Sequence, residues 1–299
     1  SGEPSPMFNL FIALALLLAG CASPIGISIA SPREVQRYLT RSALTADEPS
    51  DFSKNELRQY DLLEAYEEEP AAALAKLRAA ALAEDLPPDA LFALAELSFL
   101  QADDDSKQGS YGAAAVYAYA LLLPETDRPP LDPLDPRARI TADLYNRALT
   151  SAFRRTKEGT LALAGSGVVE LPFGRISVEV SPDMLQMNGS ELYDLQPVAE
   201  LEVRGIRNRY RQPGIGAPLA AKTRPLPGVV QPIVVGPNAR LPVTAVLLID
   251  SPLEGIRSGD LHARLEMISS LEGEQIKFAG HSVAIESEPT AALAAGLVE

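Results

Sequence analysis

The sequence predicts an α+β protein, in which an all-α region of helical hairpins precedes an antiparallel, β-sandwich-like region. Apolar residues recur at helical spacing between prolines up to about residue 157, whereas apolar and polar residues alternate in short segments from Thr160 onward. Of the 299 residues, 46% are apolar, which permits a large buried core. We therefore predict a helical domain at 31–158, a β domain at 159–288, and a linker leading to a further domain at 289–299.

The N-terminal segment predicts a secretory signal followed by a lipid anchor. The run from Met7 to Gly20 carries no charge, its one polar side chain is Asn9, and it ends in Leu-Ala-Gly-Cys21. Because this run is shorter than the roughly 20 residues that a membrane-crossing helix needs, a signal peptide is favoured over a transmembrane helix. We expect a signal peptide at 1–20 and a lipidated tether at 21–30.

The sequence around Cys21 resembles the lipobox of bacterial lipoproteins. That resemblance implies a diacylglyceryl thioether on the cysteine sulfur and an acylated amine, which together anchor a protein stably to a membrane. Ala22 and Ser23 follow the cysteine, with no Asp, and by the same resemblance this favours the outer membrane, facing the periplasm. Residues 1–6 depart from the pattern, because they contain an acid and no Lys or Arg. The alternative is a buried apolar helix with an incidental cysteine.

Helices are expected from Ser31 to about Lys157. Ser31 is a predicted N-cap, with Pro32 at the first helical position and Glu34 completing a capping box. Prolines punctuate five further predicted helices: 57–69, 71–84, 89–102, 111–123 and 137–155. The segment 112–123 is apolar on all sides, which predicts a central helix. The hairpins are similar to tetratricopeptide-type repeats, and an ordinary bundle is the alternative.

Short strands are expected from Thr160 onward. Alternation is clear in Ile176–Val180 and in Leu261–Met267, where one face is apolar and the other polar. The predicted strands are 161–163, 167–171, 176–180, 199–203, 241–248, 261–268, 275–278 and 283–285. Strands of this kind usually pair antiparallel in a sandwich or an open barrel.

Charge and composition exclude several functions. The net charge of −14 argues against a nucleic-acid partner, because phosphates would be repelled over most of the surface. Cys21 is the only cysteine, so neither an intrachain disulfide nor a cysteine-built metal site is possible within one chain. We predict no metal and no cofactor.

Catalytic motifs are absent from the sequence. No G-x-S-x-G nucleophile elbow occurs, and Gly165-Ser166-Gly167 lacks its spacing. His262 and His281 are the only histidines. His281 adjoins Ser282, but neighbours in a strand point to opposite faces. We predict that both histidines are exposed polar residues in or beside strands, and we assign no catalytic residue.

The most unusual stretch is rich in arginine. It contains Arg204, Arg207, Arg209 and Arg211, of which the last three alternate, so an extended backbone would place them on one side. Guanidinium groups suit the binding of an anion, a carboxylate or an acidic partner domain. The alternative is a set of surface ion pairs, each contributing about 0–1 kcal/mol. The candidate contact region also includes two glycines that permit a tight backbone path, Gly214 and Gly216.

The order of these features resembles bacterial lipoproteins that contain an α/β-hydrolase domain of the esterase or lipase type. The resemblance covers most of the mature chain and is carried by 18–26, 91–97, 113–120, 143–149, 200–210, 213–219, 241–247 and 288–293. It implies that the catalytic domain, with its own nucleophile, acid and histidine, lies downstream of this region. No catalytic residue of the family has a counterpart among these 299 residues.

The sequence therefore leads to one main hypothesis and two others. The first is a membrane-anchored, non-catalytic module that positions or covers a hydrolase domain through the arginine stretch. The second is a free-standing envelope lipoprotein that binds a peptide or protein partner through its helical repeats. A reading frame that continues past Glu299 with a G-x-S-x-G motif would favour the first over the second. The third, a hydrolase within this chain, requires a histidine beside a serine and a carboxylate.

Overall fold

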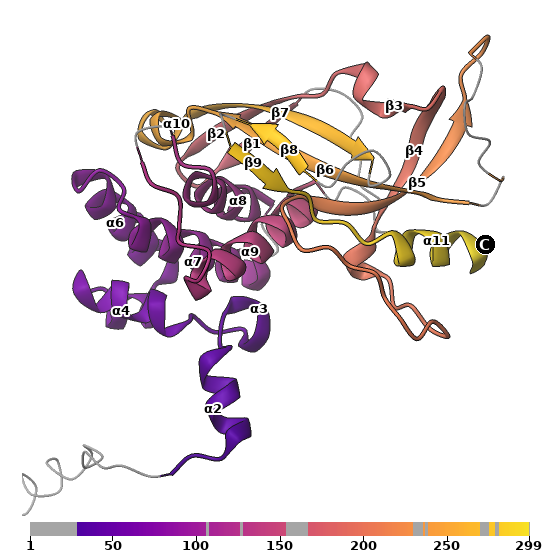
Figure 1. The fold of residues 1–299 in the computed structure, drawn as a ribbon. Coiled ribbons are helices and arrows are strands. Elements are labelled where there is room, and N and C mark those ends of the chain that lie inside the picture. The colour runs from indigo at the N-terminus through magenta and orange to yellow at the C-terminus, as the bar shows by residue number, and fades with distance from the viewer. Residues whose placement is uncertain are drawn as a thin grey trace, which may run out of the picture. The chain divides into compact units, whose positions relative to one another are not determined.

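The computed structural model describes residues 29–105, 108–125, 128–153, 167–229, 236, 239–269, 275–278 and 281–298 (Figure 1). The predicted signal peptide, Cys21, the strand at 161–163 and the end of the last predicted helix lie outside these residues. The chain divides into two compact units, Ser1–Thr40 and Arg41–Glu299, which we describe separately.

The first unit contains helix α2, Pro32–Leu39, and its start confirms the predicted cap. The Ser31 hydroxyl accepts a hydrogen bond from the Glu34 amide, and the Glu34 carboxylate accepts one from the Ser31 amide at 2.7 Å. These reciprocal bonds satisfy two amides that a helix start would otherwise leave free.

The second unit opens with a series of helices, most of which begin at a cap or proline. They are α3 (Ala43–Ala46), α4 (Asp51–Gln59), α5 (Leu63–Glu68), α6 (Pro70–Ala83), α7 (Pro88–Asp105), α8 (Gln108–Leu122) and α9 (Pro136–Ala152). Consecutive helices α7, α8 and α9 pack against one another. Helix α8 is buried along most of its length, which confirms the predicted central helix. The helix predicted at 57–69 is divided into α4 and α5 by Asp61, whose positive φ of 56° ends α4.

A buried carboxylate joins the first of these helices to α7. Glu96, which is fully buried, accepts hydrogen bonds from the Ala43 amide at 2.9 Å, the Ser50 amide at 3.0 Å and the Ser50 and Ser53 hydroxyls at 2.6 Å. Because its partners are all neutral donors, this carboxylate is held by hydrogen bonds and not by an ion pair. It fixes α3 and the start of α4 against α7.

The strands form one curled, mixed sheet in the order β1-β2-β7-β6-β5-β4-β3 (Figure 1). They are β1 (Gly167–Leu171), β2 (Gly174–Glu179), β3 (Gln186–Met187), β4 (Ser190–Pro197), β5 (Ala217–Pro225), β6 (Leu241–Asp250) and β7 (Asp260–Ser269). Strands β2 and β7 pair parallel, with Ile176 opposite Leu261, and the other neighbours pair antiparallel. A separate hairpin joins β8 (Gln275–Phe278) to β9 (His281–Ala284).

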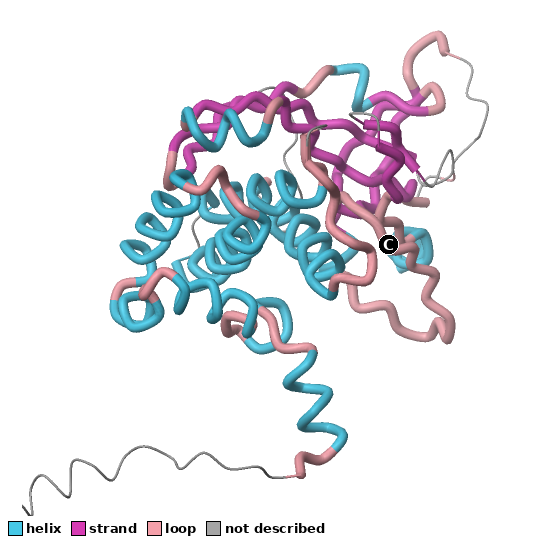
Figure 2. The backbone as a smooth tube through the Cα atoms, turned by 60° about the vertical axis from the view of Figure 1, so that its left-hand side comes forward, coloured by secondary structure: helices cyan, strands magenta, loops and turns pink. Residues whose placement is uncertain are grey.

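The α+β class is confirmed, but the β region differs from the predicted antiparallel sandwich. Helices pack against the sheet, as Figure 2 shows, so a second sheet is not needed to bury its apolar face. The hydroxyl of Tyr145 in α9 accepts a hydrogen bond from the amide of Leu247 in β6 and donates one to its carbonyl, at 2.9 and 2.8 Å. Helices and strands of this unit consequently share one hydrophobic core.

Several predicted local structures are wrong or incomplete. The predicted strand at 199–203 is instead a 3-10 turn at Val198–Glu200 followed by irregular backbone. Strands β3, β4 and β5 have no counterpart in the prediction. Two further helices are α10, Pro252–Ser258, and α11, Pro289–Val298, which lies within the predicted linker. Ala291 and Ala292 of α11 are fully buried with Ala220 of β5.

Candidate functional site

The arginine-rich stretch forms a loop, residues 201–216, between the 3-10 turn and β5. We call it the arginine loop. Its backbone is attached to the segment before α11 by two isolated bridges, Gln212 to Ser287 and Ile215 to Ile285. The loop therefore begins as free irregular backbone and ends as a short pairing with the C-terminal part of the chain.

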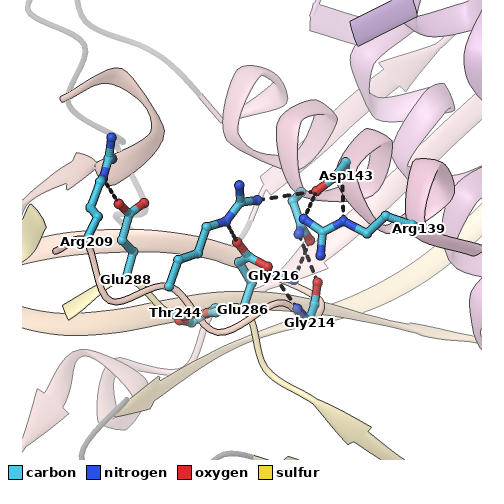
Figure 3. Close-up of polar contacts among 10 residues, drawn as sticks. Arg139, Asp143, Arg209, Gly214, Gly216, Thr244, Glu286 and Glu288 are labelled. Carbon is cyan, nitrogen blue, oxygen red and sulfur yellow. Dashed lines mark hydrogen bonds and ion pairs between the residues drawn. The ribbon is translucent and has the colours of Figure 1, made fainter. Parts of the chain in front are cut away.

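Two arginines of the loop are paired with two buried glutamates (Figure 3). Arg209 donates from Nε to Glu288, and Arg211 donates from Nε to Oε1 of Glu286 at 2.5 Å. The glutamate side chains are only 8% and 3% exposed, whereas the arginine side chains are 45% and 51% exposed. The guanidinium groups thus compensate carboxylates that would otherwise be buried without a counter-charge.

Helix α9 extends this network. Arg211 also contacts Asp143 at 3.4 Å, and Asp143 is held by Arg139 at 2.7 Å. Burial lowers the pKa of Arg211, but its hydrogen bond to Glu286 and the negative charges of Glu286 and Asp143 outweigh that effect and raise the pKa above its ordinary value. Arg211 accordingly stays charged at every pH at which the protein is folded.

Gly214 and Gly216 of the loop lie where its backbone passes close to other segments. The Asn146 side chain donates to the Gly214 carbonyl at 3.0 Å and accepts from the Gly216 amide at 2.6 Å. A Cβ atom at Gly214 would lie 2.4 Å from the Ala284 carbonyl oxygen, and one at Gly216 would lie 2.5 Å from a methyl carbon of Thr244. Both positions therefore require glycine for close packing.

A cavity of about 660 Å³ lies beside these pairs, among α3, α9 and the arginine loop. Its charged lining residues are Arg147, Arg209, Arg211, Asp47, Asp143, Glu286 and Glu288. Because acids outnumber arginines there, the positive charge that an anion clamp requires is already neutralised. The arrangement fastens the loop and offers no concentrated cationic pocket.

The outward side of the loop is different. Ile206 is 43% exposed and Tyr210 is 77% exposed, and Arg207 is exposed and has no ion pair among the described residues. Arg204 forms only an exposed pair with Glu202 at 2.6 Å. The Tyr210 amide donates to the Thr290 hydroxyl at 2.8 Å, which fixes the backbone under the exposed ring. An aromatic ring, an aliphatic side chain and two arginines therefore share one solvent-facing loop.

His262 forms no catalytic arrangement with the described residues, and the side chain of His281 lies outside the described part of the structure. His262 is exposed on β7, as predicted, and lies opposite Ser177 of β2 and Asp250 of β6 in the strand register. Although these three residues are neighbours across the sheet, no hydrogen bond joins them in the described part of the chain, whereas a triad requires that contact. His281 begins β9, opposite Phe278.

In the described residues, no group of three or more His, Cys, Asp or Glu residues is placed to hold a metal ion. The same residues include no helix with the length and apolar character needed to cross a membrane.

Comparisons of the chain with protein-family models, with curated proteins and with solved structures gave no match. The likeness to hydrolase-domain lipoproteins therefore stays a prediction from the sequence, and function has to be argued from the geometry of the site.

Sequence reasoning did not identify the partners of the arginines. Glu286 and Glu288 alternate in the sequence as Arg209 and Arg211 do, and this matching spacing in two polar segments was the available signal. Asn146 and Asp143 gave a weaker signal, as polar residues beside the predicted buried face of α9.

Proposed function

We propose that the protein is a lipid-anchored lipoprotein of the bacterial outer membrane whose 41–299 unit is a non-catalytic accessory module. The sequence ending in Cys21 supports the anchor. In this proposal the module positions or covers an esterase- or lipase-like α/β-hydrolase domain, and the arginine loop is the contact surface.

The observation that carries this proposal is that the side chains of the loop face two ways, some toward the protein and some toward solvent. Arg209 and Arg211 bind buried carboxylates inside the protein, while Arg207, Ile206 and Tyr210 face solvent. Tyrosine and arginine are the residue types that most often dominate protein–protein binding energy. The backbone at Tyr210 is held by Thr290, so this part of the loop loses little conformational entropy when a partner binds.

Charge indicates the kind of partner surface that the loop suits. The protein as a whole carries a net charge of −14, whereas the loop presents Arg207, which is exposed and has no ion pair among the described residues, beside Arg204, which is paired with Glu202. An acidic patch on the partner would be attracted to the loop and repelled by the rest of the acidic surface. This difference would orient the partner during docking.

Adding the α/β-hydrolase domain in trans, as a separate polypeptide, tests the proposal. The 299-residue protein should bind that domain, and binding should weaken about tenfold when Arg207→Glu and Tyr210→Ala are combined. Leu134→Ala is the matched control, because Leu134 is 91% exposed and lies outside the loop. Equal binding of the hydrolase domain by the double variant and the control would refute the docking role.

A further inference from the structure

A second cavity, of about 670 Å³, lies among α6, α7, α8 and the turn between β1 and β2. Apolar groups form much of its wall, namely Leu74, Leu94, Ala113 and Phe173. Two serines, Ser98 and Ser110, also line the cavity. Its volume falls within the range of about 300–1,000 Å³ that is typical of small-molecule sites.

Among the described residues, Arg78 is the cation that lines this cavity, and none of them supplies it with a counter-charge. Arg78 of α6 donates from Nη2 to the carbonyl of Ile256 at 2.5 Å, and its guanidinium lies 4.9 Å from the centre of the Phe173 ring. Tyr117 also lines the cavity, where burial raises the pKa of its hydroxyl and the neighbouring Arg78 opposes that rise. All three neighbours are neutral, and no ion pair to Arg78 is formed by any described residue.

The hydrogen-bonding capacity of Arg78 is also incomplete. Its Nε is buried and has no acceptor. A buried donor without a partner costs about 1–3 kcal/mol, and more when it is charged. Arginine is rarely buried unless it is paired. The half-buried guanidinium is therefore a place at which an incoming carboxylate would gain both charge pairing and hydrogen bonds.

The other charged residue in the cavity lining, Glu170, does not act as a counter-charge for Arg78. Glu170 of β1 lines the cavity, but its side chain is exposed and forms no ion pair with Arg78. Its register partner is Arg175 of β2, which forms an ion pair with Asp260 at 3.0 Å and does not line the cavity.

We propose that this cavity binds a monocarboxylate with an apolar chain, such as a free fatty acid, with the carboxylate on Arg78 and the chain along the apolar wall. The inference does not depend on the arginine loop, which lies elsewhere in the unit and shares no lining residue with this cavity. Ile256, Phe173 and Tyr117 are neutral, so they leave the positive charge of Arg78 uncompensated. A bound carboxylate would form an ion pair with the guanidinium and compensate that charge.

Calorimetric titration of the full chain with sodium decanoate tests this proposal. We expect one binding site, and we expect decyltrimethylammonium, which has the same chain and the opposite charge, to bind at least about tenfold more weakly. Arg78→Met should weaken decanoate binding by about tenfold or more, because it keeps the length of the side chain and removes the charge. Lys76→Met is the matched control on the same helix, since Lys76 is exposed and outside the cavity.

A second variant keeps the test decisive if Arg78→Met does not fold, as judged by circular dichroism. Ala75→Phe fills the cavity from the exposed side of α6 and leaves Arg78 in place, so it should also abolish decanoate binding. Equal affinity for the decyl cation and decanoate would overturn the proposal. Retention of wild-type decanoate affinity by a folded Arg78→Met or Ala75→Phe protein would do the same.

Discussion

The buried carboxylate of Glu286 accepts hydrogen bonds from two parts of the arginine loop, the Arg211 side chain at 2.5 Å and the Gly214 amide at 2.8 Å. The Glu286 carbonyl also accepts a hydrogen bond from the Thr244 hydroxyl of β6 at 2.6 Å. One residue near the C-terminal end thus connects the loop to the central strand of the sheet.

This connection predicts that Arg211 stabilises the fold. Arg211→Met should lower the free energy of unfolding by about 1–2 kcal/mol, because it leaves Glu286 buried with one charged partner fewer, while water reaches the half-exposed site and limits the loss. Urea unfolding followed by circular dichroism measures the change. Arg204→Met, which breaks only the exposed pair with Glu202, should leave the free energy of unfolding close to that of the wild type. Equal effects of the two substitutions would contradict the assignment.

Substitutions at two glycines of the loop distinguish the cost of tight packing from the cost of backbone strain. Gly216 has φ of 111° and Gly205 has φ of 79°, but only Gly216 is enclosed by neighbouring atoms. Gly205→Ala should cost about 1–2 kcal/mol from the left-handed backbone alone. Gly216→Ala should cost about 2–4 kcal/mol, because overpacking against Thr244 is added. Thermal unfolding of both variants gives the comparison, and a larger loss at Gly205 would be inconsistent with the described packing.

Local signals explain which parts of this fold could be predicted. Ser31, Pro70, Pro88 and Pro136 mark helix starts through their own side chains, and the predictions there agree with the structure. Strands β2 and β7 were recognisable because one face of each is buried and the other exposed, which makes the sequence alternate. Such features depend only on neighbouring residues.

The remaining features depend on contacts between distant segments. The buried residues of β5, which are Ala217, Leu219, Ala220 and Ala221, lie on both faces of the strand, so no alternation reveals it. Parallel pairing of β2 with β7 joins segments about 85 residues apart, and no local pattern specifies it. The same is true of the candidate site, where the charge of Arg211 is visible in the sequence but its pairing with Glu286 is not.

A buried glutamate in α4 predicts a pH dependence of stability. Glu56 is 5% exposed, and its Oε1 is buried without a hydrogen-bond partner. Burial raises the pKa of Glu56, and the nearby carboxylates of Asp89 and Glu84 raise it further, against the opposing charge of Arg137. Since the folded protein holds this proton more tightly than the unfolded chain, stability is lost as pH rises from the unfolded value of about 4.5 through the folded pKa.

The corresponding test is Glu56→Gln, which removes the charge and keeps the shape of the side chain. We expect the free energy of unfolding at pH 7 to rise by about 1 kcal/mol, and the difference from wild type to shrink as pH falls toward 4.5. Urea unfolding at several pH values measures both. Glu67→Gln, at an exposed position of α5, is the control and should change little. A loss of stability at pH 7 in Glu56→Gln would argue against the raised pKa.

Lipid attachment at Cys21 is a separate prediction. In the native host, mass spectrometry of the N-terminal peptide should find an acylated Cys21 as the first residue, because the preceding segment fits a lipobox. Cys21→Ser should shift the protein from the detergent phase to the aqueous phase in a phase-separation assay. An unmodified thiol with Met7 still attached upstream would exclude the anchor.

Site-specific photo-cross-linking in intact cells tests the docking role of the arginine loop most directly. A photoreactive phenylalanine analogue at position 210 replaces an exposed tyrosine, and the same analogue at position 134 replaces a still more exposed leucine outside the loop. The proposal predicts a discrete cross-linked product with an α/β-hydrolase domain from position 210 alone, and its loss when Arg207→Glu is added. Cross-linking that is no stronger at position 210 than at position 134, or that is unchanged by Arg207→Glu, would contradict it.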